Sequence, residues 1–365
     1  MDKKNQFLKY SVFSKKVEIL NLLLPVLFII LIFLIPEPKN NLSATFNFSL
    51  FFVSEFIFLN TLHVFFTITL LFFVPEFKNY MHDKSHVVGR PILKTWLGFY
   101  FFAVIFFSLQ RYVNFTQTNN SAIMQISALV SIAINLYIVH HGLSQSVGLS
   151  LTHYSSFVKI PESGKIVLTK IMAAERRLVP LVMLLTVIVF MALKLENKIL
   201  TTTIFSISCL ILFIYLGQIL FKIYKFDIEL FKLKLLFHSR FFLFLLFFYN
   251  SLAVALRAAV HGVEYFMVTK TIFSKSKLTC TKRNFFIYLI LAVLFSVVTV
   301  NSLAQNVNQY FYNKPFEGSF FDHFCYVFSM SLSVVHFFID SFIYKMSDPA
   351  VKSNQGRLLV ESGSA

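Results

Sequence analysis

The chain has 365 residues, of which 57% are hydrophobic and only 14% are charged, and its mean hydropathy is +0.71. Soluble domains carry about a quarter charged residues, so this composition excludes an ordinary soluble protein and predicts an integral membrane protein. The net charge of +16 does not indicate nucleic-acid binding, because lysine and arginine gather in the cytoplasmic loops of membrane proteins. Three scattered cysteines, with no CxxC spacing, indicate neither a disulfide framework nor a cysteine-based metal site.

Long apolar segments recur along the chain, and a membrane-spanning helix needs roughly 20 apolar residues. The pattern predicts an all-α, polytopic transmembrane helix bundle of about nine spans, within a range of roughly eight to ten. We expect residues 1–345 to form a single transmembrane domain and residues 346–365 to form a flexible polar tail. The predicted spans are, in chain order, residues 19–36, 46–74, 95–110, 122–149, 178–195, 200–222, 241–268, 285–304 and 322–345.

The basic residues predict the orientation of these spans. The N-terminus and the loops at 76–94 and 150–177 are basic and alternate with loops poor in lysine and arginine, which places the N-terminus in the cytoplasm. The second half breaks this alternation, because 222–240 and 270–283 are both basic although one helix separates them. Either one of these loops violates the charge rule, or residues 223–240 form an amphipathic interfacial segment.

Four predicted spans carry polar side chains at helical spacing, which places these side chains on one face of each helix. Ionisable groups at bilayer depth are costly unless they pair or line a cavity, so we expect these faces to look inward. Each face contributes a histidine, and two faces add a carboxylate one turn away. The four faces are Asn60, His63 and Thr67; His141, Ser144, Gln145 and Gly148; Asn250, Arg257, His261 and Glu264; and Ser329, Ser333, His336 and Asp340.

Imidazole and carboxylate ligands together suit iron or zinc, and helix bundles build such sites from inward-facing side chains. The sequence therefore predicts a metal site to which four helices contribute. Glu264 and Asp340 are the expected catalytic carboxylates, either as ligands or as acceptors that orient a ligand. Iron is the expected metal, with zinc or manganese as alternatives. The predicted ligands are His63, His141 (or His140), His261 and His336.

Other interpretations of the same side chains stay open. Polar residues also hold transmembrane helices together, through interactions worth about 1 kcal/mol each. Arg257 forms either an internal ion pair with Glu264 or a clamp for an anionic headgroup. Gln145 and Glu55 are further candidates, the latter as part of a proton path. Three histidines near predicted interfaces are expected to be exposed, namely His153, His238 and His323.

Three segments resemble a group of largely uncharacterised bacterial multi-pass membrane proteins, some of them labelled carotene-monooxygenase-like. The segments HHGLSQSVG, HGVEY and HFFIDSFIYK are similar to that group's motifs HYxxQxxG, HNxQY and HYxxDxxIWK. The chain departs from the motifs at Gly262, Glu264 and Tyr344. The resemblance implies a histidine-rich membrane protein and a non-haem iron enzyme. The matched positions are His141 (or His140), Gln145, Gly148, His261, Tyr265, His336, Asp340 and Lys345.

Two functions from different classes follow from these features. The first is a membrane-embedded iron oxygenase or oxidase that acts on a lipophilic small molecule, such as an isoprenoid, a carotenoid or an acyl chain. The second is a proton- or ion-coupled transporter that uses buried histidine, carboxylate and arginine side chains. A seven-helix receptor is a weaker third possibility. An opsin would need a lysine in the middle of a span to bind retinal, and no lysine lies in the middle of a predicted span. In each case the expected location is the bacterial inner membrane.

Overall fold

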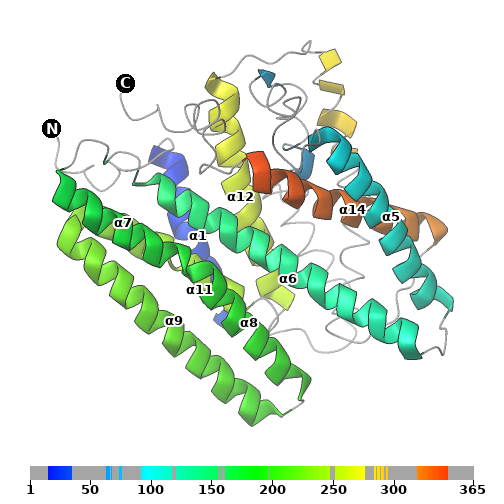
Figure 1. Cartoon of the computed structure of the whole chain (residues 1–365), viewed down its shortest axis with the longest axis horizontal. Coiled ribbons are helices and arrows are strands. Elements are labelled where there is room, and N and C mark those ends of the chain that lie inside the picture. The colour runs from blue at the N-terminus through cyan, green and yellow to red at the C-terminus, as the bar shows by residue number, and fades with distance from the viewer. Residues whose placement is uncertain are drawn as a thin grey trace. The chain divides into compact units, whose positions relative to one another are not determined.

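A computed structural model describes the helical parts of the chain (Figure 1). Every regular element among the described residues is an α-helix, which confirms the all-α prediction for them. These residues form two units. The first unit contains α1, α7 to α11, α6 from Val139 onward and α12 up to Glu264; the second contains α5, the start of α6, the end of α12 and α14. The described residues are 15–34, 63–65, 67, 74–75, 92–116, 121–154, 157, 161–195, 197–246, 251–275, 283–284, 286–287, 289–291, 293–294 and 319–343.

Helices cover most of the predicted spans that fall on described residues. Three helical stretches there are long and apolar enough to cross a membrane, namely Glu162–Leu193, Lys198–Phe226 and Leu252–Ile272, while Glu18–Leu34 and Leu97–Leu109 are shorter. This is consistent with a membrane protein. Most of the predicted spans 46–74 and 285–304, the tail 346–365 and Glu55 lie outside the described residues. The nine-span count and the single domain over 1–345 stay predictions.

In the first unit, α8 (Leu178–Lys194) and α9 (Lys198–Phe226) lie side by side as an antiparallel hairpin, and α7 (Glu162–Arg176) precedes α8 (Figure 1). Large apolar side chains cover the outer surface of this hairpin, including Phe213, which is 67% exposed. Monomeric soluble proteins rarely expose an apolar surface this extended to water. The exposed face of α9 therefore supports contact with lipid.

Side-chain caps fix where these helices begin. Asn197 precedes α9, and its side-chain oxygen accepts a hydrogen bond of 3.0 Å from the Leu200 amide. Asp227 interrupts the helical backbone after α9, and its carboxylate accepts hydrogen bonds from the amides of Glu229 (2.9 Å) and Leu230 (2.8 Å) at the start of α10 (Ile228–Phe237). Each such cap stabilises a helix by about 1 kcal/mol, so Asp227 both ends α9 and begins α10.

Within residues 223–240, α10 is a helix of its own that is packed on one face; whether it lies at a membrane interface stays a prediction. The side chains of Leu230, Leu233 and Phe237 in α10 are fully buried, at spacings of three and four residues. A second short helix, α11 (Arg240–Leu245), follows before α12 (Ser251–Lys275). The predicted span 241–268 is therefore two helices rather than one.

The remaining long helices complete the two units. In the first unit, α1 (Lys15–Leu34) packs against α10 and α11. In the second unit, α14 (Phe320–Ile343) packs along α5 (Ile92–Thr116), where the Arg111 guanidinium lies 3.5 Å from the centre of the Tyr326 ring. The helix α6 (Ser121–Thr152) contributes its N-terminal part to the second unit and its C-terminal part to the first.

Candidate functional site

Two predicted histidine ligands meet in the second unit. The Nε2 atoms of His63 and His336 are 2.8 Å apart, and the two ring centroids are 4.6 Å apart at nearly perpendicular angles. Both side chains are buried, with exposed fractions of 4% and 2%. The two Nε2 atoms therefore face each other inside the protein at hydrogen-bond distance, where one imidazole donates and the other accepts.

Asp340 lies one turn beyond His336 on α14 and is held by two hydroxyl groups. Its Oδ1 atom accepts hydrogen bonds from the Tyr265 hydroxyl at 3.0 Å and from the Thr67 hydroxyl at 3.1 Å. The two hydroxyls also contact each other. Thr67 in turn lies four residues after His63, so both i, i+4 pairs predicted from the sequence face the same cluster.

The buried histidine and aspartate side chains could hold a metal ion. A ring nitrogen of His336 lies within 4.8 Å of a ring nitrogen of His63, and a ring nitrogen of His336, not necessarily the same one, lies within 4.8 Å of a carboxylate oxygen of Asp340. We call His63, His336 and Asp340 the His–Asp group. Two imidazoles and one carboxylate form the donor set that non-haem iron favours, and zinc accepts the same donors. The hydroxyls of Tyr265 and Thr67 would orient the carboxylate, as outer hydrogen bonds do in metal sites.

The other predicted ligands lie in the first unit. His141 on α6 and His261 on α12 are both buried, and their ring centroids are 5.4 Å apart in an edge-to-face arrangement. The neighbouring His140 is exposed and Gln145 is half-buried, so His141 is the inward-facing histidine of that pair. The joint site of all four histidines stays a prediction.

Glu264, the second predicted catalytic carboxylate, is held by two partners in the first unit. It forms an ion pair with Arg240 of α11, and it accepts a hydrogen bond of 3.2 Å from the Ser146 hydroxyl of α6. The Arg257 guanidinium carbon lies 5.3 Å from the centre of the Phe244 ring, a cation–π contact. The sequence offers Arg257 as either a partner of Glu264 or a clamp for an anionic headgroup, and the ion pair of Glu264 with Arg240 is not among its predictions.

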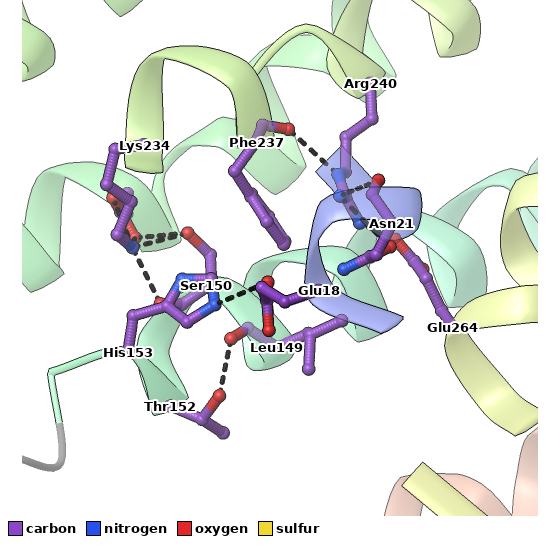
Figure 2. Close-up of polar contacts among 11 residues, drawn as sticks. Glu18, Asn21, Leu149, Ser150, Thr152, His153, Lys234, Phe237, Arg240 and Glu264 are labelled. Atoms are coloured by element: carbon purple, nitrogen blue, oxygen red, sulfur yellow. Dashed lines mark hydrogen bonds and ion pairs between the residues drawn. The ribbon is translucent and has the colours of Figure 1, made fainter. Parts of the chain in front are cut away.

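The first unit also contains a buried charge network that is not among the sequence predictions. The Lys234 ammonium donates to the Ser150 carbonyl (2.6 Å) and the Ser150 hydroxyl (2.7 Å) (Figure 2). It also donates to the Glu175 carboxylate (3.0 Å). Glu175 also accepts hydrogen bonds from the Tyr154 hydroxyl (2.7 Å) and from His238 Nε2 (3.1 Å). We call these five residues the charge network, and it joins α6, α7 and α10.

Two further contacts fasten α1 to this region (Figure 2). His153 Nε2 lies 3.6 Å from the Glu18 carboxylate, and both side chains are fully buried. The Arg240 guanidinium donates to the Asn21 backbone carbonyl at 3.2 Å while it pairs with Glu264. A buried charge without partners would cost several kcal/mol, so these contacts determine where α1 can pack.

Burial and pairing determine the charge state of the network at neutral pH. Burial lowers the pKa of Lys234 from 10.5 to about 8, and the Glu175 carboxylate opposes that shift. The pKa of Tyr154 lies well above its ordinary value of 10.0 because the phenol is buried beside the same carboxylate. The network therefore holds one ammonium and one carboxylate, with a neutral phenol and a neutral imidazole.

The sequence does contain a signal for this network. Glu175 follows Leu168 and Ile171 of α7 at the spacing of a buried helix face, and Lys234 follows Leu230 of α10 by one turn. A charged residue in the apolar stripe of an amphipathic helix indicates a buried partner. The sequence prediction of a loop over 150–177, and of a loop or an amphipathic interfacial segment over 223–240, does not include this buried pair.

The expectation that His153 and His238 are exposed is wrong, since their exposed fractions are 0% and 1%. Each follows the end of a helix, at a place where that end packs against a carboxylate from another helix, Glu18 or Glu175. His323, near the start of α14, is half-buried.

Acidification is expected to destabilise the first unit through these two histidines. Burial lowers the pKa of His153 and His238 below the ordinary value of 6.5, although a nearby carboxylate opposes the shift in each case. The unfolded chain therefore binds protons near pH 6.5 that the folded chain binds only at lower pH, so the free energy of unfolding falls as the pH drops below 6.5. Thermal unfolding of purified protein across pH 5–8 measures this. The curve should flatten in His238→Gln and keep its slope in the exposed control His140→Gln.

Close packing of α6 on α11 gives a second prediction. A Cβ atom on Gly142 would lie 3.1 Å from the Phe244 ring and 3.3 Å from the Arg257 guanidinium, whereas one on Gly148 would meet nothing within 4 Å. We expect Gly142→Ala to lower the free energy of unfolding by about 1 kcal/mol because the ring must move. Gly148→Ala, on the same helix, should raise it by up to about 1 kcal/mol through helix propensity. Equal effects of the two substitutions would contradict this packing.

Comparison of the chain with protein-family models, with curated proteins and with solved structures finds no match. The chemistry that the described residues offer is therefore argued from their geometry. In the second unit, buried imidazoles and an oriented carboxylate offer a ligand set for a metal ion. In the first unit, buried ion pairs offer proton donors and acceptors inside an apolar protein.

Proposed function

We propose that the protein is a membrane-embedded, metal-dependent oxidoreductase, specifically a non-haem iron oxygenase or oxidase with a lipophilic substrate. The observation that carries the proposal is the buried His–Asp group, in which His336 lies 2.8 Å from His63 between their Nε2 atoms and also offers a ligand atom within 4.8 Å of one of Asp340. An iron ion with such ligands keeps open positions at which dioxygen can bind. Zinc or manganese would suit the same side chains and are the alternatives for the metal.

Two features favour a metal over simple helix-to-helix hydrogen bonding. A hydrogen bond between helices needs one donor and one acceptor, whereas His336 has two potential ligand groups near it, His63 and Asp340. Asp340 also accepts hydrogen bonds from two hydroxyl groups on the same oxygen, Oδ1, which holds its carboxylate in one orientation. Hydrogen bonds that hold a carboxylate in one orientation are a regular feature of metal sites.

The substrate class follows from the surroundings. The chain carries helices long and apolar enough to cross a bilayer. A compound that is dissolved in the bilayer reaches a site buried among such helices more easily than a polar compound does. Isoprenoids, carotenoids and acyl chains are substrates of this kind. In this proposal His63 and His336 bind the metal, and Asp340 is a ligand or a proton acceptor. The proposed location is the bacterial inner membrane, with a cytoplasmic N-terminus.

Elemental analysis of detergent-purified protein tests this function. We expect about one iron, zinc or manganese ion per chain, and we expect its loss in the His63→Ala/His336→Ala double variant. The exposed His140→Ala is the matched control and should retain the metal. A His141→Ala/His261→Ala variant separately tests the predicted four-histidine site. Wild-type protein without metal, even after reconstitution with Fe(II) under anaerobic conditions, would refute the proposal.

The buried charge network favours a second candidate, a proton-coupled transporter. Ionisable groups in the interior of membrane proteins often form proton or ion paths, and the first unit buries three carboxylates, Glu18, Glu175 and Glu264. Proteoliposomes with a pH-sensitive dye inside would show proton movement that depends on a co-transported solute. Flux lost in Glu264→Gln and kept in the exposed control Glu162→Gln would support transport. Flux indistinguishable from empty liposomes would exclude it.

A further inference from the structure

Exposed basic side chains gather at one end of the helical layer formed by α7, α8 and α9. On α7 and the turn after it they are Lys170, Arg176 and Arg177, and on the last turns of α9 they are Lys222 and Lys225. We call these five residues the basic surface. Both helices belong to the first unit and pack together, and the Tyr215 hydroxyl of α9 donates to the Ala174 carbonyl of α7 at 3.0 Å.

Among the residues that the structure describes, no acidic side chain forms an ion pair with the five cations of the basic surface. Two other lysines nearby have ion pairs, Lys165 with Glu162 (3.1 Å) and Lys232 with Glu229 (2.7 Å). The surface therefore carries a net positive charge that an anionic partner would complement.

The distance of the basic surface from the α8–α9 turn, measured along the helices, matches the thickness of a bilayer up to its headgroups. The turn between α8 and α9 follows Leu195, the C-cap of α8, and precedes Lys198, the first residue of α9. With a rise of 1.5 Å per residue, Arg177 lies about 27 Å along the helices from that turn, and Lys170 and Lys222 lie about 38 Å from it. The hydrocarbon core of a bilayer is about 30 Å thick, and about 40–45 Å with its headgroups. If the turn lies at one interface, the basic surface lies at the opposite one.

Apolar and aromatic side chains are interleaved with these cations. Phe221 and Tyr224 are 57% and 50% exposed on α9, and Ile166 is 53% exposed on α7. The Lys225 ammonium lies 4.4 Å from the centre of the Phe221 ring. Exposed aromatic and aliphatic groups beside lysine are typical of a membrane interface, whereas a surface that binds nucleic acid does not need exposed aliphatic groups.

We propose that the basic surface binds the phosphate groups of anionic phospholipids in the membrane that contains the protein. Cations near a bilayer surface attract anionic lipids, and the effect adds over several residues. The interaction would hold the α7 end of the layer at the headgroups, directly outside the charge network to which α7 contributes Glu175. This inference is independent of the metal centre.

Binding of fluorescent phosphatidylglycerol to the purified full-length chain in a neutral detergent tests the proposal, with phosphatidylcholine as the uncharged comparison. We expect a preference for phosphatidylglycerol that weakens as salt is added. The triple variant Lys170→Gln/Lys222→Gln/Lys225→Gln should bind phosphatidylglycerol roughly ten- to a hundredfold more weakly. The matched control Lys198→Gln, an exposed lysine at the other end of α9, should bind as the wild type does.

A second variant separates charge from folding. Lys170→Arg/Lys222→Arg/Lys225→Arg keeps every positive charge and should restore the binding that the glutamine variant loses. Undiminished binding by the glutamine variant would overturn the proposal. Complete displacement of the lipid by an equal concentration of inorganic phosphate would also overturn it, because the surface would then be a site for a free anion. Tighter binding of a DNA oligonucleotide than of phosphatidylglycerol would do the same.

Discussion

Replacing Glu175 with alanine is expected to lower the free energy of unfolding by about 3–5 kcal/mol, which is the largest effect we expect of any single substitution in the first unit. The Lys234 ammonium would stay buried without its carboxylate, and the Tyr154 hydroxyl and His238 would lose an acceptor. Removal of one partner of a buried ion pair costs more than the pair contributes, because an uncompensated charge remains in an apolar surrounding. Thermal unfolding or titration with a denaturing detergent measures the loss.

A double-mutant cycle separates the ion pair from the loss of packing. In Glu175→Ala/Lys234→Met both charges are absent, so we expect the double variant to be markedly more stable than Glu175→Ala alone. Glu162→Ala is the matched control on the same helix, since its pair with Lys165 is exposed and should contribute less than about 1 kcal/mol. Simple additivity of the two single losses would show that Glu175 and Lys234 do not act as a pair.

The network shows which part of the fold sequence reasoning could predict. The length of the apolar segments predicted helices such as α8 and α9. A run of apolar residues long enough to span a bilayer must satisfy its own backbone hydrogen bonds, and a helix does this. The same criterion treated the more polar stretches as loops, although α7 and α10 are helices there. Each of the two helices is stabilised by the burial of one narrow apolar face, and α10 is also capped by Asp227. The mean hydropathy over a window of residues detects neither feature.

The candidate site was predictable to the extent that its residues lie on single helices. Spacing of four residues placed His63 with Thr67 and His336 with Asp340, and both pairs do share a cluster. Spacing cannot show which residue of another helix completes a contact. That is why Arg240 was missed as the partner of Glu264, and why Tyr265 was noticed only through a resemblance.

The role of Asp340 gives the sharpest prediction for the second unit. If the His–Asp group binds a metal ion, Asp340→Ala should weaken metal affinity by more than about a hundredfold. Removing a residue that only hydrogen-bonds to a ligand weakens metal affinity by about 10–100-fold, and removing the ligand itself should weaken it further. Tyr265→Phe removes one hydroxyl donor to Oδ1 and keeps the ring, so it should weaken affinity by about 10-fold. Competition with a metal-sensitive dye in detergent solution measures both affinities.

Two comparisons distinguish the loss of a metal ligand from a general loss of structure. Asp340→Asn keeps the size of the side chain and one oxygen that can accept the hydrogen bonds of Thr67 and Tyr265, but it removes the negative charge. It should therefore unfold like the wild type while it binds the metal weakly, because a carboxylate attracts a divalent cation far more strongly than an amide does. Metal affinity unchanged in both Asp340→Asn and Asp340→Ala would exclude Asp340 as a ligand. The two histidines alone would then be too few to retain an ion, and the buried pair at 2.8 Å would be a hydrogen bond between helices.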